Sequence, residues 1–473
     1  MRPPPDHPLR WLTDRVDREP DDVAIIDDTG SLTYGRLWDC LGRWSRQLAA
    51  AGLERQRPTA VLTNSRARSA RALWLAYYGG LPLLLMNPGH PSPGRLMSQC
   101  GVEQAICDAS VRLPDGVRRI PCRPLDGDGR GASLEPAPLG MGKTQLMVPT
   151  SGTEGPARAV MLSARNIAAA ALATNRVLGL ARRHMWLCSL PLIHIAGVMI
   201  LMRCAAAGAT VRLTEKFDAR DAAASMAAEG ITHISVVPAM LHRLLEAGTD
   251  PKGLSAVLVG GANISDHVLR AAMKAQWPLK VAYGLTETTA HVALGDLLRS
   301  DRSMAPVPGT HIDVISTGDD VAGSAAGWIQ ITGPSVMLGY ANPGLIPGHG
   351  LVGRQSFRTN DLGRLDKDGR LVVLGRGDDV LISGGTNVHP AQVEDLLSGC
   401  PGIREVAVTG RPDPVWGARI VALFAGDADE DSVATWCLEN IPGPMRPREF
   451  RKVRRLPRTA LGKIRRRDLP GLI

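Results

Sequence analysis

The sequence predicts an α/β protein with a large N-terminal domain of parallel-rich sheets and a β-rich subdomain, followed by a small α+β C-terminal domain. Short apolar runs alternate with helical stretches rich in Ala, Leu and Arg, which is typical of parallel sheets. After about residue 300 the segments become punctuated by Gly and Asp, as in antiparallel hairpins. The chain of 473 residues also exceeds the size of a single hydrophobic core.

The N-terminal region predicts a protein that is neither exported nor inserted in a membrane. The opening "MRPPPDHPLRWLTDR" has prolines and charges where a signal peptide has an apolar segment, so we expect a cytoplasmic location. The longest apolar run, 72–86, contains Gly-Gly and Pro and is shorter than the roughly 20 residues of a membrane-spanning helix. We interpret this run as a buried helix followed by a strand.

The next elements follow from apolar periodicity and from turn residues. Strands are expected at 60–64, 81–87, 233–238 and 256–261, and helices at 164–183 and 219–230. In the last part of the chain, the segments 388–400, 403–411, 418–426 and 430–441 are interpreted as strand, helix, strand, helix. We place the boundary in "GRGDD", 375–379, which gives domains 1–377 and 378–473.

Charge and cysteine content exclude two classes of function. The formal net charge is +9, and residues 446–467 contain eleven Lys and Arg against one acid, so the basicity belongs to this tail. No aromatic residues interleave with the arginines of 457–469, and we therefore expect no nucleic-acid partner. The eight cysteines form no C-x-x-C pair, which favours reduced core thiols over a zinc site.

A polar stretch, "TSGTEGPARAV" at 150–160, is a candidate phosphate-binding loop. Successive backbone N–H groups in such a turn can form an anion-binding nest, to which side-chain hydroxyls add donors. Taken alone, the stretch is equally typical of a polar turn. The similar "GMGKT" at 140–144 lacks the first glycine and the preceding strand of a phosphate-binding loop, so we interpret it as a linker.

Two further segments can bind parts of a nucleotide. In "AYGLTETTAHV", 282–292, Tyr283 can stack on a purine, and Glu287 is suited to Mg²⁺ near phosphates; the alternative is a strand that ends in a turn. In 358–379, Asp361 can accept hydrogen bonds from both ribose hydroxyls, and Arg376 can donate to the sugar or to a phosphate. Lys463 follows a glycine in the basic tail and is suited to reach a distant site.

Together, in this order, these motifs resemble the acyl-adenylate-forming superfamily of acyl- and aryl-CoA ligases, adenylation domains and luciferases. The resemblance covers nearly the whole chain, and the stretch 188–287 is most similar to the o-succinylbenzoate-CoA ligases of menaquinone biosynthesis. It implies an enzyme that uses ATP, Mg²⁺ and coenzyme A.

The resemblance also implies a role for each candidate residue. The ATP phosphates are expected to contact Thr150, Ser151, Gly152, Thr153, Gly155, Arg158 and Thr286, and Mg²⁺ to contact Glu287. Adenine is expected beside Gly260, Gly261, Ala262, Tyr283 and Gly284, and the ribose beside Asp361 and Arg376. Lys463 is expected to approach the substrate carboxylate and the α-phosphate, and Asp378 to be the hinge about which family members rotate the small domain.

On the acyl side, the resemblance places His194 and Gly284 near the substrate, and Arg243 is a candidate partner for a second carboxylate. A lone histidine among apolar residues is more often a core residue, so His194 has a structural alternative.

The loop departs from the family pattern, since Pro156 and Arg158 replace lysines and Glu154 stands where threonine is common. Ala196 replaces a serine that is frequent in o-succinylbenzoate ligases.

These observations predict an AMP-forming acyl/aryl-CoA ligase that adenylates an aromatic or keto acid, o-succinylbenzoate being one candidate, and transfers the acyl group to coenzyme A. The first alternative is an adenylating enzyme that loads an acyl carrier protein, whose acidic surface the basic tail would meet. A second alternative is a degenerate nucleotide-binding or nucleic-acid-binding protein; Glu287, Asp361, Arg376 and Lys463 argue against it. A homodimer is the assembly to test.

Overall fold

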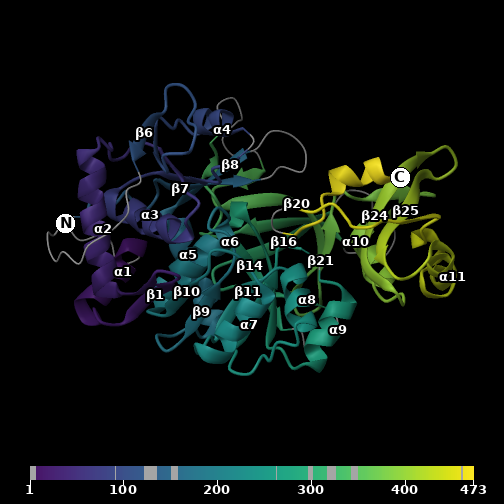
Figure 1. Ribbon diagram of the computed structural model, residues 1–473. Helices are drawn as coiled ribbons and strands as arrows, with labels where there is room; N and C mark the ends of the chain where they lie inside the picture. Colours follow the sequence, from purple (N-terminus) through teal and green to yellow (C-terminus); the bar gives the residue numbers. More distant parts are fainter. Residues whose placement is uncertain are drawn as a thin grey trace.

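The computed structural model describes residues 7–90, 92–121, 136–150, 158–262, 264–296, 302–316, 326–341, 350–459 and 462–473. Within these ranges, four sheets and their helices form a large body and a smaller lobe (Figure 1). The α-helices are α1 Pro8–Arg18, α2 Tyr34–Ala50, α3 Arg66–Gly79, α4 Pro93–Gln99, α5 Ala164–Leu178, α6 Ile195–Ala207, α7 Ala219–Ala228, α8 Pro238–Glu246, α9 Asp266–Lys274, α10 Pro390–Leu397 and α11 Glu430–Asn440. The 3-10 helices are η1 Thr286–Thr288, η2 Gly443–Met445 and η3 Arg466–Leu472.

The first large sheet is parallel in its centre and antiparallel at both edges. Its order is β15-β14-β13-β12-β11-β9-β10-β1-β2, and the pairs from β13 to β1 are parallel. Its strands are β1 Val23–Asp27, β2 Gly30–Thr33, β9 Met185–Cys188, β10 Thr210–Leu213, β11 His233–Val236, β12 Ala256–Gly260, β13 Leu279–Leu285, β14 Ala290–Asp296 and β15 Ala305–Pro306. The carboxyl ends of β11, β12 and β13 therefore meet at one edge, where ligands of α/β proteins bind.

The second large sheet has the same mixed character, in the order β18-β8-β7-β4-β3-β5-β6. Its strands are β3 Thr59–Leu62, β4 Leu83–Met86, β5 Gln104–Cys107, β6 Arg118–Pro121, β7 Thr144–Thr150, β8 Arg158–Ser163 and β18 Gly339–Tyr340. Strands β3, β4 and β5 are buried at every position, as expected of parallel strands covered on both faces. The interpretation of 72–86 is confirmed, because α3 leads into β4.

The β-rich subdomain is an antiparallel sheet of β16, β17, β20, β19 and β21. Its strands are β16 His311–Ser316, β17 Gly327–Thr332, β19 Leu351–Gly353, β20 Ser356–Leu365 and β21 Leu371–Arg376. The turn at 366–369 joins β20 to β21, with the Asp366 N–H donating to the Arg370 carbonyl at 2.9 Å. This sheet lies between the large body and the smaller lobe (Figure 1).

The smaller lobe contains the last sheet with α10 and α11 (Figure 1). Its strands are β22 Leu381–Ser383, β23 Thr386–Val388, β24 Ile403–Asp413, β25 Gly417–Gly426 and β26 Glu449–Lys452. The expected order of strand, helix, strand, helix is wrong for 388–426, because α10 is followed by the antiparallel hairpin of β24 and β25. The fold class is confirmed, whereas the boundary at 377/378 stays a prediction.

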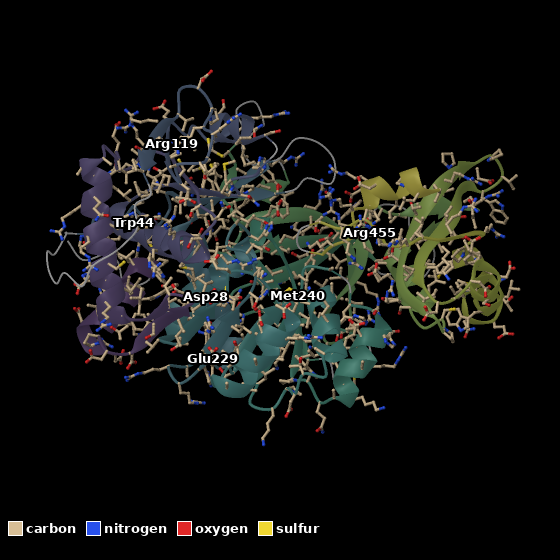
Figure 2. All side chains as sticks on the ribbon, viewed as in Figure 1. Asp28, Trp44, Arg119, Glu229, Met240 and Arg455 are labelled. Carbon is tan, nitrogen blue, oxygen red and sulfur yellow. The ribbon has the colours of Figure 1, made fainter. Side chains whose placement is uncertain are left out.

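The core of the large body is continuous between its two large sheets, with α5 and α6 among the helices that fill the space. Figure 2 shows side chains throughout the layers, and Met240 of α8 packs against both this core and the one under α7 and α9. The last sheet has a separate core around Phe424. None of the described helices is both long and apolar enough to cross a membrane.

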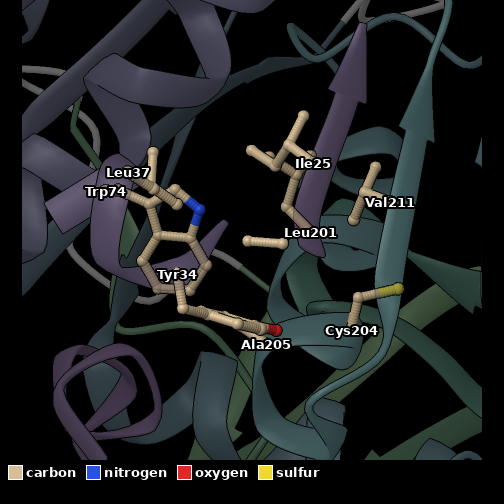
Figure 3. Close-up of a pocket in the computed structure, with 9 residues that line it drawn as sticks. Ile25, Tyr34, Leu37, Trp74, Leu201, Cys204, Ala205 and Val211 are labelled. Carbon is tan, nitrogen blue, oxygen red and sulfur yellow. The ribbon is translucent and has the colours of Figure 1, made fainter. Parts of the chain in front are cut away.

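A small internal cavity shows which face of α6 points into the core (Figure 3). Leu201, Cys204 and Ala205 of α6 line it, opposite Tyr34 of α2 and Val211 of β10. Its walls are almost entirely apolar and belong to the core, and no candidate residue lines it, so this cavity is a packing feature.

Candidate functional site

Two glycines at the end of β12 allow the terminal lysine to approach the sheet closely. A Cβ on Gly260 would lie 2.9 Å from the Ala282 carbonyl oxygen of the neighbouring strand β13. Gly261 has a φ of 80°, and a Cβ there would lie 3.4 Å from Cε and 3.8 Å from Nζ of Lys463. Ala262 follows in an exposed position. The predicted Gly261 and the predicted lysine are therefore neighbours, 202 residues apart in sequence.

Lys463 projects from a tight turn of the C-terminal tail. The Thr459 N–H donates to the Lys463 carbonyl at 2.7 Å, and the Lys463 N–H donates to Thr459 Oγ1 at 3.2 Å. Gly462 adopts a φ of 79° in this turn and faces Ala239 at the start of α8. Solvent reaches the lysine side chain, but the surrounding protein lowers the pKa of its amine, and Asp361 opposes that change. The turn thus holds a cation beside Gly261 at the end of β12.

Asp361 and Tyr283 form the second part of the cleft. Tyr283 Oη donates to Asp361 Oδ2 at 2.7 Å, and Arg376 NH1 lies 3.5 Å from Asp361 Oδ1. Asp361 and Arg376 are opposite residues of β20 and β21, so the antiparallel register alone brings them together. Burial raises the pKa of the Asp361 carboxyl, against the influence of Tyr283 and Arg376. These three groups offer acceptors and donors for a sugar.

Glu287 is oriented by a tyrosine that the sequence motifs did not reveal. It lies in η1, directly after Thr286, and its Oε1 accepts a hydrogen bond of 2.8 Å from Tyr340 Oη. The guanidinium Cζ of Arg158 lies 5.4 Å from the centre of the same tyrosine ring. Tyr340 belongs to β18, which pairs with β8, and the segment around it carried only turn signals in the sequence.

The backbone after η1 is strained. Thr289 and Ala290 have φ values of 54° and 77°, although neither is glycine. A Cβ on Gly284 would collide with the Ala290 carbonyl, so only glycine fits across from this turn. Such strain persists where surrounding structure enforces it, frequently at functional sites. Here the Thr289 hydroxyl donates to the Ser335 carbonyl at 2.7 Å.

The candidate phosphate loop is only partly described. Thr150 and Arg158 face each other at the ends of β7 and β8, and Thr150 Oγ1 donates to the Arg158 carbonyl at 3.3 Å. Ser151, Gly152, Thr153, Glu154, Gly155 and Pro156 lie outside the described residues. The loop therefore begins and ends near Tyr340 and Glu287, where phosphates would meet Mg²⁺.

The two residues predicted on the acyl side, His194 and Arg243, lie in different surroundings. His194 is the N-cap residue of α6, and burial together with Lys463 lowers the pKa of its imidazole to about 4. Arg243 is exposed on α8, with its Cζ 5.2 Å from the centre of the Phe217 ring. His194 thus lies within the electrostatic influence of Lys463, whereas the described contacts of Arg243 are with Phe217 and with the charge of Asp218.

Ion pairs surround the predicted hinge. Arg376 NH2 lies 2.8 Å from Asp378 Oδ2, which ties the two ends of the segment 376–378. The next residue, Asp379, accepts from Arg466 Nε at 3.0 Å, and the same arginine pairs with Glu394 of α10 at 2.8 Å. Sequence reasoning missed Asp379 and Arg466, because one acid and one base in charged segments carry no pattern.

The groups present fit a magnesium ion held mainly by phosphates. No cluster of three or more His, Cys, Asp or Glu side chains suited to a metal occurs within the described ranges. Mg²⁺ is commonly bound by one or two carboxylates plus substrate phosphates, and Glu287 supplies such a carboxylate beside the ends of the loop.

Known proteins are similar to this chain in sequence and in architecture. The family model described as AMP-binding enzyme matches residues 12–341, and the one described as AMP-binding enzyme C-terminal domain matches 392–463. A 2-succinylbenzoate–CoA ligase of Geobacillus kaustophilus is 31% identical over 98% of this chain and 97% of its own length.

Two solved structures of the o-succinylbenzoate-CoA synthetase of Bacillus subtilis are similar along nearly the whole chain. The complex with the acyl-adenylate intermediate has a TM-score of 0.86 at 27% identity and covers 97% of both chains. The complex with ATP and magnesium has a TM-score of 0.87 at 28% identity, covering 97% of this chain and 99% of the other.

Proposed function

The chain belongs to the AMP-binding enzyme family and is an AMP-forming acid–thiol ligase, and on that premise we propose that its acid is 2-succinylbenzoate and its acceptor coenzyme A. The substrate proposal is carried by the full-length similarity to a 2-succinylbenzoate–CoA ligase. This substrate agrees with the menaquinone-biosynthesis ligases that the sequence resembles. A cytoplasmic location is also part of the proposal.

In the first half-reaction, a carboxylate oxygen of the acid attacks the α-phosphorus of ATP, and pyrophosphate leaves. Negative charge develops on the phosphoryl oxygens and on the departing pyrophosphate. Lys463 stands where it can stabilise this charge, because the turn at 459–463 holds it against Gly261. Bound Mg²⁺ would neutralise phosphate charge beside Glu287.

The nucleoside is held by groups that need no rearrangement. Asp361 accepts from the ribose hydroxyls, and Tyr283 and Arg376 keep its carboxylate in place. Preorganisation of this kind lowers the barrier, since the donors and acceptors are already oriented when the substrates bind.

In the second half-reaction, the thiol sulfur attacks the carbonyl carbon of the acyl-adenylate. The thioester bond forms, the bond to the phosphate oxygen breaks, AMP leaves, and the thiol proton passes to solvent. Lys463 occupies the cleft that the thiol must enter, so this step is proposed to follow a movement of the tail about Asp378.

The test is a panel of acids in ATP–pyrophosphate exchange, followed by addition of coenzyme A and detection of the thioester. Exchange with 2-succinylbenzoate and formation of its CoA thioester are expected. Exchange without a CoA thioester, but with acylation of a phosphopantetheinylated carrier protein, would replace the acceptor proposal. Exchange only with other acids would overturn the substrate proposal.

A further inference from the structure

Lys463 is carried by a short hairpin of the C-terminal tail, which we call the lysine hairpin, residues 457–459 and 462–465. The Arg465 N–H donates to the Pro457 carbonyl at 2.9 Å, and further backbone bonds close the tip of the hairpin at Lys463. A two-stranded hairpin is marginally stable at best when it is isolated in water. The position of the lysine therefore depends on what holds this hairpin on the smaller lobe.

Apolar contacts hold the lysine hairpin on the last sheet. Ile464 packs against a small buried cluster of the lobe that contains Ala407, Leu423, Leu456 and Leu469. Ala407 of β24 and Leu423 of β25 alternate along their strands with the residues of the core around Phe424, so they lie on the other face of the sheet. Apolar contact is non-directional, and it keeps the hairpin on this face without fixing its orientation.

Polar contacts of Arg466, the residue that follows the hairpin, supply the orientation. Arg466 Nε lies 3.0 Å from Asp379 Oδ2, and Nη2 lies 2.8 Å from Glu394 Oε2 of α10. Nη1 donates to the Val408 carbonyl of β24 at 3.1 Å. All three nitrogens of the guanidinium are thus bonded, each to a different segment of the lobe, and this planar group presents its donors in one rigid geometry.

Arg466 also connects two parts of the site that are far apart in sequence. It follows Lys463 by three residues, and its partner Asp379 directly follows the predicted hinge. Its second partner is fixed in turn, since Glu394 Oε1 accepts from the Val408 N–H at 2.7 Å. The side chains of Arg466 and Glu394 are only 28% and 13% exposed, so salt screens this pair less than a pair on the surface. One guanidinium therefore links the lysine hairpin to the hinge.

We propose that Arg466 is a positioning residue for adenylation, which joins the lysine hairpin, the segment after the hinge and α10 into one rigid unit and so sets Lys463 at one place in the site. It acts through Lys463 and not on the reacting atoms. This inference deepens the proposed function and rests on it, because it presupposes that Lys463 stabilises charge at the α-phosphate. The lysine has no partner in the second half-reaction, so the arginine has no effect there.

The test measures both half-reactions in Arg466→Met. Adenylation at saturating ATP and acid is expected to slow roughly 10- to 100-fold, because a displacement of about 1 Å in a catalytic group has an effect of this size. The KM for ATP should change about twofold or less, since the lysine acts on charge that develops in the transition state. Thioester formation from a supplied acyl-adenylate should stay within about threefold of wild type.

A double-mutant cycle with Lys463→Ala separates a positioning role from a purely structural one. When Arg466→Met is added to Lys463→Ala, adenylation should slow by a further twofold or less, roughly, because residues that act as a unit are not additive. A loss of stability alone would slow adenylation equally in both backgrounds.

Two further variants guard against misfolding. Arg466→Lys keeps a cation between Asp379 and Glu394 but loses the rigid fork of donors, so adenylation is expected to slow about three- to tenfold while the lobe stays folded. Arg419→Met removes a similar ion pair of the same lobe, with Asp413 at 2.7 Å, and should leave adenylation within about twofold of wild type. Thermal unfolding of each variant checks its stability.

Two outcomes would overturn the inference and leave the proposed function intact. The first is an equal slowing of adenylation by Arg466→Met in the wild-type and Lys463→Ala backgrounds, which would show that Arg466 acts without the lysine. The second is a parallel slowing of both half-reactions in Arg466→Lys. Adenylation at the wild-type rate in Lys463→Ala would instead contradict the role of the lysine in the proposed function, and the inference with it.

Discussion

At the scale of single residues, the site depends on a few side chains with opposing charges held at fixed places. Asp361 stays in a buried position because Tyr283 and Arg376 bond to its carboxylate, and Lys463 adds a cation nearby. Glu287 is fixed by Tyr340. Each of these contacts predicts a separable effect on one step of the reaction.

Lys463→Ala is expected to slow adenylation roughly 100- to 1000-fold, because it removes the cation that stabilises charge at the α-phosphate. Thioester formation from a supplied acyl-adenylate should stay within about threefold of wild type, because the lysine has no partner in that step. Pyrophosphate exchange and single-turnover thiolysis measure the two steps. Lys452→Ala, an exposed lysine of β26, is the matched control, and parallel loss of both steps would contradict the assignment.

Tyr340→Phe removes the hydroxyl that orients Glu287 and keeps the ring under Arg158. The Mg²⁺ concentration for half-maximal exchange should rise about tenfold, as for other groups that orient a metal ligand. A magnesium titration at saturating ATP measures it. Tyr34→Phe removes a different buried hydroxyl, which donates to the Ala209 carbonyl, and should change stability only. An unchanged magnesium requirement in Tyr340→Phe would show that the Tyr340 hydroxyl has no role in magnesium binding.

At the scale of elements, helix α10 is tied to the large body through Arg302. This arginine lies 2.9 Å from Asp395 of α10 and also pairs with Asp266 of α9. The contact joins Asp266 and Asp395, which are 129 positions apart in the sequence. In the same structure, Lys463 lies beside Gly261. We therefore propose that the contact stabilises the arrangement used for adenylation.

Arg302→Gln is expected to slow adenylation about two- to fivefold, because a partly exposed ion pair contributes up to roughly 1 kcal/mol. Thioester formation should be unchanged or faster, since the tail is released more easily. Rapid-quench measurement of both half-reactions tests this. Arg68→Gln breaks a similar pair, with Asp108, inside the large body and should affect neither step. A slower second step in Arg302→Gln would contradict this role.

Most positions of helices and strands were predictable from the sequence, but the order of helix and strands in 388–426 was not. The apolar runs of β3, β4, β11 and β12 are buried on both faces, and this burial is what their sequence pattern records. The hairpin of β24 and β25 does not follow from the pattern, because a strand such as 418–426, buried at 420–425, and a charged strand such as 403–411 show no shared period.

At the scale of the whole molecule, two bodies with separate cores meet at the site. Phe424 belongs to the core of the smaller lobe, and β21 ends at Arg376, five residues before that lobe's first strand begins at Leu381. Between them, a Cβ on Gly377 would collide with the Trp328 ring, so only glycine permits this approach. A rotation about this segment requires freedom in very few backbone angles.

Asp378→Pro fixes one of those angles and is expected to leave adenylation within about tenfold of wild type while reducing thioester formation at least about 100-fold. Asp378→Asn is the matched control, since it loses the carboxylate that pairs with Arg376 but keeps the backbone free. Separate assays of the two half-reactions measure the effect. Equal behaviour of the two variants would show that the charge, and not the rotation, matters.

The sequence by itself determined the fold class and the reaction class, and it proposed the residues of the nucleotide site, because short motifs with local chemistry carry that information. Gly261, Asp361 and Lys463 were all identified in this way. The tertiary structure decided what depends on distant contacts: that Tyr340 orients Glu287, that Arg243 lies exposed over Phe217, and that Arg203 is buried without a counterion among the described residues. Burial and pairing arise only when separate segments pack, so no local pattern records them.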